Sequence, residues 1–272
     1  VTLTFVGWGG PDEAEVFQQL TDSFNANNSD VQIVYENVPG DYITELNTRI
    51  AAGTPPDIAY IPDGNFYSFV SRGQLVDLQS LVDAADSGFD EQTLWPSALG
   101  RYRYDPATGT PGEGNLYALP KDIGPTVVFI NVDMFNAAGV PLPDPNVPLT
   151  WDQVQDIGAQ LTLDSAGNHP TDDGFNPDDI VQWGVGDVFF ENIVYGNGGR
   201  IVSEDGRTFA AADDQNTLDA IQWVADLDHV YHIRPTAQTA TSIGWGALFE
   251  QGKVAMTTAG RWATTGFRDT LT

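Results

Sequence analysis

Trp262 is the residue whose surroundings most clearly suggest a chemical use. It ends the stretch LFEQGKVAMTTAGRW, residues 248–262, in which Gly252 can cap a helix with a positive φ and residues 253–256 alternate as a short strand does. Gly260 lets the backbone turn just before the ring. A large flat ring directly after a strand end is well placed to face a cleft, and the same ring could equally serve as a core or lid aromatic.

Two further groups of candidate residues come from the N-terminal part of the chain. Strand and helix patterns alternate there, with strands at 1–6, 31–35 and 55–61 and helices from 11 and over 42–52. This alternation indicates a parallel α/β sheet with right-handed crossovers. Ligands bind such sheets at the carboxyl ends of the strands, which here means residues 8–12, with Trp8 and Asp12, and residues 63–65, with Asp63.

The remaining chain continues the α/β pattern with one long irregular part. Residues 66–81 are predicted to be mostly helical, whereas residues 83–114 are rich in Gly, Pro and Asp and show little periodicity. Residues 126–131 (TVVFIN) predict a buried strand from their β-branched content. Pro and Gly on both sides of Asp122 indicate a crossing strand or a hinge between two lobes.

The loop DSAGNHPTDDGFNPDD, residues 164–179, is dense in oxygen ligands. Asp164, Asn168 and Asp172 are its candidate metal ligands, and alternating Asp and Asn with Gly could wrap Ca²⁺. Their spacing does not match the twelve-residue helix-loop-helix calcium loop. We therefore prefer a solvated acidic loop as the interpretation, with no metal and no cofactor.

Composition excludes several classes of protein. The 272 residues include 38 acidic and 11 basic side chains, for a formal net charge of −27 at pH 7. Such a surface repels phosphate backbones, so we exclude nucleic acid as a partner and attribute the acidity to solubility, compatible with salty surroundings. The absence of cysteine excludes disulfides and thiol chemistry, and no apolar run approaches the roughly 20 residues that a transmembrane helix needs.

Five motifs, taken together, resemble one family of proteins. They are AAGTPPDI at 51–58, LYALP at 116–120, NVDMFNAAG at 131–139, TWDQ at 150–153, and FEQGKVAM at 249–256 followed by GRW at 260–262. In this order they resemble the extracellular sugar-binding proteins of ABC importers, the cluster related to maltose-binding protein. The resemblance spans nearly the whole chain.

The resemblance implies a two-lobe periplasmic-binding-protein fold, type II-like, in which each lobe is a sheet flanked by helices and a hinge joins the lobes. Residues 1–122 would form the first lobe, rejoined by the chain from residues 263–272 onward, and residues 123–262 would form the second. Because the family pattern continues beyond the GRW motif, we expect the chain to be truncated at its C-terminus.

The resemblance also implies a function. The protein would capture a mono- or oligosaccharide in the cleft between its lobes, close around it without changing it chemically, and deliver it to the transmembrane subunits of an ABC importer. We expect a monomer in an extracellular or periplasmic location, which an N-terminal lipid anchor ahead of this chain could tether to the membrane.

Candidate ligand-binding residues follow from the matched motifs. Asp63, after the strand PDIAYI, and Asp122, after YALPK, correspond to carboxylates that accept sugar hydroxyls, and Trp262 corresponds to a ring that lies against a sugar face. The others are less closely aligned: Trp8 and Asp12 in the first strand-to-helix loop, and Phe190 or Glu191 ahead of GNGG.

Two alternatives stay open at this point. A glycoside hydrolase also combines acids and aromatic rings in a cleft, and Asp63 and Asp122 could be its paired carboxylates. The same scaffold could instead bind another solute such as a polyamine; the acidic candidates make an anionic ligand less compatible with the sequence. Turnover of an oligosaccharide would distinguish the enzyme from the binding protein.

Overall fold

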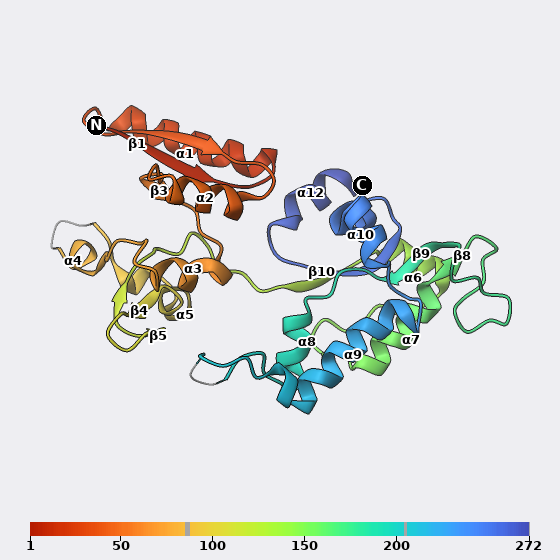
Figure 1. Cartoon of the computed structure of the whole chain (residues 1–272). Helices are drawn as coiled ribbons and strands as arrows, with labels where there is room; N and C mark the ends of the chain where they lie inside the picture. Colours follow the sequence, from red (N-terminus) through yellow and green to blue (C-terminus); the bar gives the residue numbers. More distant parts are fainter. Residues whose placement is uncertain (85–87, 204–205, 272) are drawn as a thin grey trace. The chain divides into compact units, whose positions relative to one another are not determined.

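The computed structural model describes residues 1–84, 88–203 and 206–271, apart from the side chain of Asp12. The chain forms two compact units, unit 1 comprising Val1–Lys121 and unit 2 comprising Asp122–Thr272. Each unit combines helices with β-sheet, as the sequence predicted (Figure 1). Within the described residues, no helix has the length and apolarity that crossing a bilayer requires.

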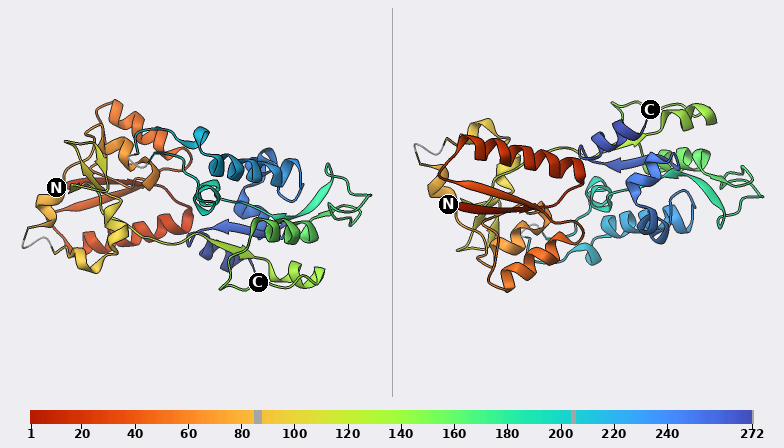
Figure 2. Two further views of the ribbon diagram at one scale, coloured as in Figure 1. Left: turned by 90° about the horizontal axis from the view of Figure 1, so that it is seen from below. Right: turned by 90° about the horizontal axis from the view of Figure 1, so that it is seen from above.

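Unit 1 begins with a three-stranded parallel sheet in the order β2-β1-β3. Its strands are β1 (Thr2–Gly7), β2 (Gln32–Asn37) and β3 (Ile58–Ala59), and the crossovers are α1 (Pro11–Asn27) and α2 (Tyr42–Ala51). The two helices cover opposite faces of the sheet (Figure 2). Because neighbouring side chains of a strand point to opposite faces, Phe5 of β1 meets Phe17 of α1, whereas Val6 is buried in a cluster with Tyr42 and Leu46 of α2.

The second half of unit 1 is a small antiparallel sheet with short helices. Its elements are α3 (Asp63–Val70), α4 (Gln79–Val82), the 3₁₀ helix η1 (Glu91–Thr93), α5 (Pro96–Gly100), β4 (Arg103–Asp105), β5 (Thr110–Pro111) and β6 (Asn115–Leu116), with strand order β5-β4-β6. The sequence predicted mostly helix over 66–81. The structure instead ends α3 early because Gly73 adopts a φ of 68° and the Gln74 amide donates to the carbonyl of Phe69.

Unit 2 is built on a four-stranded mixed sheet in the order β7-β10-β9-β8. Strands β9 (Ile180–Val185) and β10 (Val254–Ala259) are parallel, while β7 (Val127–Ile130) and β8 (Leu163–Asp164) pair antiparallel to β10 and β9. The helical elements are α6 (Val132–Ala138), α7 (Trp151–Leu161), α8 (Phe190–Gly196), η2 (Ala211–Asp213), α9 (Gln215–His229), α10 (Ala237–Ile243), α11 (Trp245–Glu250) and α12 (Ala263–Thr270).

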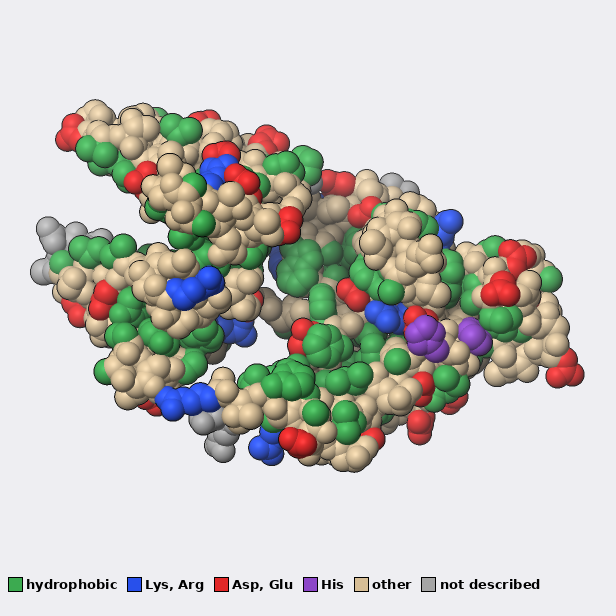
Figure 3. Space-filling view, in the orientation of Figure 1, with side chains coloured by type: hydrophobic (Ala, Val, Ile, Leu, Met, Phe, Trp, Pro, Cys, Tyr) green, Lys and Arg blue, Asp and Glu red, His purple; other side chains and the backbone are tan. Residues whose placement is uncertain are grey.

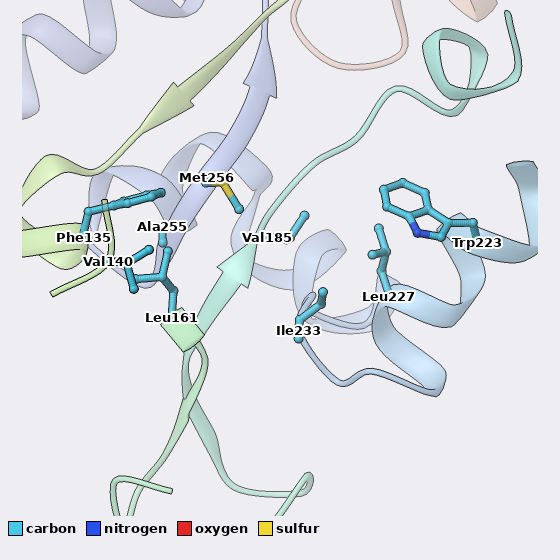
Figure 4. Packing of buried hydrophobic residues seen from close by; sticks show 9 residues of the cluster. All are labelled: Phe135, Val140, Leu161, Val185, Trp223, Leu227, Ile233, Ala255 and Met256. Carbon is cyan, nitrogen blue, oxygen red and sulfur yellow. The ribbon is translucent and has the colours of Figure 1, made fainter. Parts of the chain in front are cut away.

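The main core of unit 2 lies between the sheet and helices α6, α7 and α9. It contains Phe135, Leu161, Val185, Leu227 and Met256 among its buried side chains (Figure 4). Trp151 and Trp223 stack with ring centroids 5.0 Å apart at the edge of this cluster. Both rings therefore contribute to the core of unit 2.

Two segments of unit 2 differ from the expectation. The sequence assigned residues 263–272 to the first lobe, but α12 belongs to unit 2 because Phe267 packs against Phe129 and Phe249. The strand expected to be buried, β7, pairs with β10 along one side only, and Val127 and Val128 are exposed. Hydrophobicity alone predicted the strand correctly but not its place at the edge of the sheet.

Candidate functional site

The strongest concentration of candidate residues lies at one edge of the unit 2 sheet. Strands β9 and β10 are parallel neighbours, so the loops that follow their carboxyl ends meet at the same edge. The β9 loop carries Asp187 and Phe189, and the β10 loop carries Gly260 and Trp262. The rings of Phe189 and Trp262 meet edge to face, with centroids 6.4 Å apart and an interplanar angle of 66°.

One further segment, residues 124–126, reaches the same edge. Thr126 precedes β7, which runs antiparallel to β10, and its hydroxyl accepts a hydrogen bond of 2.7 Å from Asn192 of α8. Gly124 lies against Arg261, since a Cβ on this glycine would be 3.6 Å from the arginine Cβ. We call residues 124–126, 187–192 and 260–262 the edge site.

Trp262 presents its indole to solvent at the edge site. The side chain is at the boundary between Gly260 and α12, and the residue is 67% exposed. Its six-membered ring folds back over Gly260, because a Cβ placed on that glycine would come within 1.9 Å of the ring. The glycine therefore permits a fixed ring position that a larger residue would block, while much of the ring stays available for contact.

Asp187 supplies a carboxylate to the edge site that the sequence analysis did not identify. Its amide donates to Thr257 Oγ1 at 3.1 Å, and its carbonyl accepts from the Thr258 amide at 2.8 Å, which fixes the residue between β9 and β10. Burial raises the pKa of the Asp187 carboxyl, and Arg234 opposes this shift. Its position directly after a buried strand of a parallel pair is the signal that could have identified it.

The predicted residues Phe190 and Glu191 occupy the first turn of α8, within the edge site. Both are exposed. The charge of Glu191 contributes to raising the pKa of the Asp187 carboxyl. Asp122 is also exposed and lies two residues before the segment of the edge site that leads to β7.

In unit 1, Trp8 also follows a strand end but makes different contacts. Its ring stacks on Tyr60, which follows β3, with centroids 4.0 Å apart and an interplanar angle of 15°. The Lys121 ammonium lies 4.4 Å from the centroid of the Tyr60 ring and forms an ion pair with Glu13. The structure thus builds an aromatic and charged cluster at the carboxyl ends of β1 and β3, in which Trp8 is half-buried.

Asp63, another unit 1 candidate, has described side-chain partners other than Trp8. Asp63 begins α3, and its carboxylate accepts hydrogen bonds from the Gly64 amide and from Arg101 at 2.9 Å. Its side chain is 60% exposed, so this ion pair is open to solvent. The side chain of Asp12, the remaining candidate, lies outside the described part of the structure.

The acidic loop uses its oxygen atoms to hold its own backbone. Asp164 is buried and accepts hydrogen bonds from the amides of Ala166, Asn168 and Asn176. Asp172 accepts from the His169 amide, and Asn168 donates to Asp164 and to the Gly174 carbonyl. No group of three or more His, Cys, Asp or Glu residues suited to a metal ion occurs in the described ranges. These contacts give the loop acids a structural role.

Comparison with known proteins identifies the family to which the chain belongs. The pattern of the bacterial extracellular solute-binding proteins matches residues 10–270. The chain belongs to this family. The match confirms the extracellular solute-binding family that the sequence motifs indicated.

Individual relatives of this solute-binding protein are distant and longer. A putative binding protein of Brucella abortus (strain 2308) is 25% identical over 242 residues, which is 88% of this chain and 53% of the relative. The chain therefore spans about half the length of the curated relatives it matches.

Solved structures share the fold. An ABC substrate-binding protein of Listeria monocytogenes in complex with cycloalternan superposes with a TM-score of 0.80 at 23% identity, covering 99% of this chain and 64% of that one. A maltose/maltodextrin-binding domain of Bdellovibrio bacteriovorus bound to maltotriose gives a TM-score of 0.73 at 18% identity, covering 99% and 63%. The two-lobe periplasmic-binding-protein fold predicted from the sequence is confirmed.

Proposed function

We propose that this solute-binding protein is the carbohydrate-binding component of an ABC importer. The observation that carries the proposal is the edge site, where an exposed indole, a second ring and a half-buried carboxylate follow two adjacent parallel strands. Support comes from the structural neighbours, whose bound molecules are cycloalternan and maltotriose.

The chemistry of a sugar matches these groups. A pyranose presents a face of C–H groups and a rim of hydroxyls, so its site needs flat apolar rings and oriented polar atoms. Trp262 would lie against the face, and Asp187 would accept hydroxyl hydrogens at the rim. Hydrogen bonds to an ionised carboxylate are about twice as strong as neutral ones, which favours Asp187 in this role.

We extend the proposal to other residues predicted from the sequence. Phe190 and Glu191 would add contacts from α8, and Asp122 would add a carboxylate near the start of β7. Trp8, Asp12 and Asp63 would be the contacts contributed by unit 1. For Asp63, such a contact requires its carboxylate to bind sugar in addition to, or in place of, Arg101.

A ligand screen tests the proposed function. Thermal shift with maltotriose, mannotriose, cycloalternan and spermidine is followed by calorimetry on each compound that raises the melting temperature. Ligand at 100 times its Kd stabilises the folded state by about 2.7 kcal/mol, which such a screen detects. A shift with at least one saccharide is expected; a shift with spermidine alone would identify a polyamine-binding protein instead.

We propose further that the protein binds its sugar without cleaving it. The family and the structural neighbours are substrate-binding proteins, which supports this part. Mass spectrometry after prolonged incubation of an oligosaccharide with the protein is expected to return the oligosaccharide intact. Steady appearance of shorter products, abolished by Asp187→Asn, would make the protein a glycoside hydrolase.

The partners and location derive from the same proposal. The family is extracellular by description, so the protein would act outside the cytoplasmic membrane and pass its sugar to the transmembrane subunits of the importer. We propose that it does so as a monomer, which a lipid anchor on the mature protein would keep near the importer. Fractionation of the source cells, with detection of the protein in the external or membrane-associated fraction, tests this location.

A further inference from the structure

The side chain of Arg234 adjoins the edge site and makes three contacts, with Gly186, Trp245 and Asp187. It belongs to the segment between α9 and α10, which continues the hydrogen bonding of β9: the Val185 amide donates to the Ile233 carbonyl at 2.9 Å. Arg234 extends this pairing with its side chain, because Nε donates to the carbonyl oxygen of Gly186 at 3.1 Å. Its guanidinium also stacks over Trp245, 4.7 Å from the ring centroid.

The same guanidinium faces Asp187. Arg234 Nη2 lies 3.8 Å from Asp187 Oδ1, and the two side chains are only 15% and 22% exposed. Solvent therefore screens this pair far less than an exposed ion pair. Because Gly186 and Asp187 are consecutive, the Arg234 side chain contacts both the backbone at the end of β9 and the carboxylate that follows it.

The surroundings of the pair have opposing effects on the charge of Asp187. Burial disfavours its charge most, and Glu191 on α8 adds repulsion, whereas Arg234 and the Val188 amide favour the charge. Burial also lowers the pKa of Arg234, which Asp187 and Asp228 on α9 oppose. Arg234 is therefore the one positive side chain among the groups that act on the Asp187 charge in the described structure.

We propose that Arg234 is a positioning residue for ligand binding, which keeps Asp187 ionised and oriented toward the ligand at the edge site. This inference rests on the proposed function, because it assigns Asp187 the role of hydroxyl acceptor. Arg234 itself touches no ligand in this proposal. Its effect reaches the ligand through the charge and the position of Asp187.

The sign of the pH effect depends on the Asp187 carboxyl. As pH falls through its pKa, Asp187 gains a proton and loses acceptor capacity, so sugar affinity falls toward acid pH. Removing Arg234 removes an interaction that lowers this pKa, so the loss of affinity begins at a higher pH. A role in packing alone would lower affinity by the same factor at every pH.

The first experiment needs no ligand. The Asp187 side-chain carboxyl is followed by ¹³C NMR from about pH 8 to about pH 3, with Asp187→Asn identifying its signal. Arg234→Gln is expected to move the titration midpoint of Asp187 upward, and Arg234→Lys, which keeps the charge, to return it toward the wild-type midpoint. Identical midpoints in all three proteins would overturn the proposal.

The second experiment measures binding of a saccharide by calorimetry between about pH 8 and about pH 5. The ratio of the Kd of Arg234→Gln to that of the wild type is expected to rise as the pH falls, toward a limit of about tenfold for a difference of about one pKa unit. Arg200→Gln is the matched control, since Arg200 pairs with Asp214 in the same unit but is more exposed. Its ratio is expected to stay constant.

The outcomes separate the two proposals. If no saccharide binds the wild type, the proposed function fails, while the NMR midpoints still decide whether Arg234 controls the charge of Asp187. If a saccharide binds and the Kd ratio is independent of pH, Arg234 is structural and the inference fails although the function stands. If Asp187→Asn binds as tightly as the wild type, the carboxylate is not a ligand contact.

Discussion

At the scale of single residues, Gly260 and Trp262 act as one unit. The glycine has no Cβ, and the space a Cβ would take is filled by the indole, whose nearest ring atom would be 1.9 Å away. The Trp262 ring thus lies against the Gly260 backbone and meets the Phe189 ring edge to face, yet it stays exposed. A ring held in place before binding loses little conformational freedom when a ligand arrives.

Gly260→Ala is expected to weaken saccharide binding about tenfold, or about 1.4 kcal/mol, because the added methyl group expels the ring from its position. The φ of Gly260 lies outside the left-handed region, so alanine is compatible with the backbone there. Calorimetry measures the affinity, and a melting curve shows whether the fold is kept. Gly246→Ala is the control, since a Cβ there meets nothing within 4 Å. Equal affinity in both variants would contradict the support role of Gly260.

Trp262→Ala is expected to cost about 1–3 kcal/mol of binding free energy, the range for losing a buried apolar contact. Because the ring is 67% exposed without ligand, the melting temperature should change little. Trp95→Ala is the matched control: Trp95 is 72% exposed and is not among the candidate ligand-binding residues. An unchanged titration of Trp262→Ala would remove this ring from the proposed site.

The sequence predicted part of the edge site. Trp262 could be identified because strand, glycine and ring are adjacent in the chain, and Phe190 and Glu191 because they precede a recognisable turn. Asp187 and Arg234 are 47 positions apart in numbering, and only the segment alongside β9 brings them together. Contacts of this kind depend on tertiary packing, which local patterns do not encode.

At the scale of elements, α1 shows where periodicity misled the sequence analysis. The spacing of Ala14, Phe17, Leu20 and Phe24 is near the 3.6-residue period and predicts an inward-facing apolar stripe, but Leu20 and Phe24 are exposed. The helix instead turns Thr21 and Asn25 toward the sheet, where Asn25 exchanges hydrogen bonds with the backbone of Ile33. At this position, a side chain that hydrogen-bonds the free backbone groups of an edge strand stabilises the fold more than an apolar side chain would. A hydrophobicity pattern does not show this.

The contact between α7 and β9 depends on two glycines. A Cβ on Gly184 would lie 2.2 Å from the carbonyl oxygen of Gly158, so the helix and strand backbones approach closely. A Cβ on Gly158 would instead meet side chains, Ile233 Cδ1 at 2.8 Å and Val185 Cγ2 at 3.0 Å, which can shift more easily than backbone atoms. The two positions should therefore differ in their tolerance of alanine.

Gly184→Ala is expected to destabilise unit 2 by about 3 kcal/mol, the upper end for overpacking, because backbone atoms must separate. Gly158→Ala should stay within about 1 kcal/mol of the wild type, since improved helix propensity offsets the displaced Ile233. Urea unfolding of both variants gives these differences, with Gly196→Ala, whose Cβ would meet nothing within 4 Å, as control. Equal losses at positions 184 and 158 would contradict this account.

At the scale of the whole molecule, the dominant feature is the excess of negative charge. Figure 3 shows Asp and Glu side chains dispersed over the surface of both units on the face in view. The 11 basic residues are far too few to pair with the 38 acidic ones. Several basic side chains already form ion pairs, such as Arg49 with Glu36 and Arg103 with Glu91, but exposed pairs contribute at most about 1 kcal/mol each.

We expect added salt to stabilise the folded protein, because repulsion among unpaired acids outweighs the attraction in these ion pairs. Raising KCl from about 0.1 M to about 1 M shortens the Debye length from about 10 Å to about 3 Å and screens mainly the repulsion. The melting temperature should rise by about 5 °C, which corresponds to about 1–3 kcal/mol for units of this size. Asp173→Asn combined with Asp178→Asn removes two loop charges, so the salt dependence of this variant should be smaller. A melting temperature that stays constant or falls with KCl would show that the ion pairs dominate the electrostatic free energy of folding.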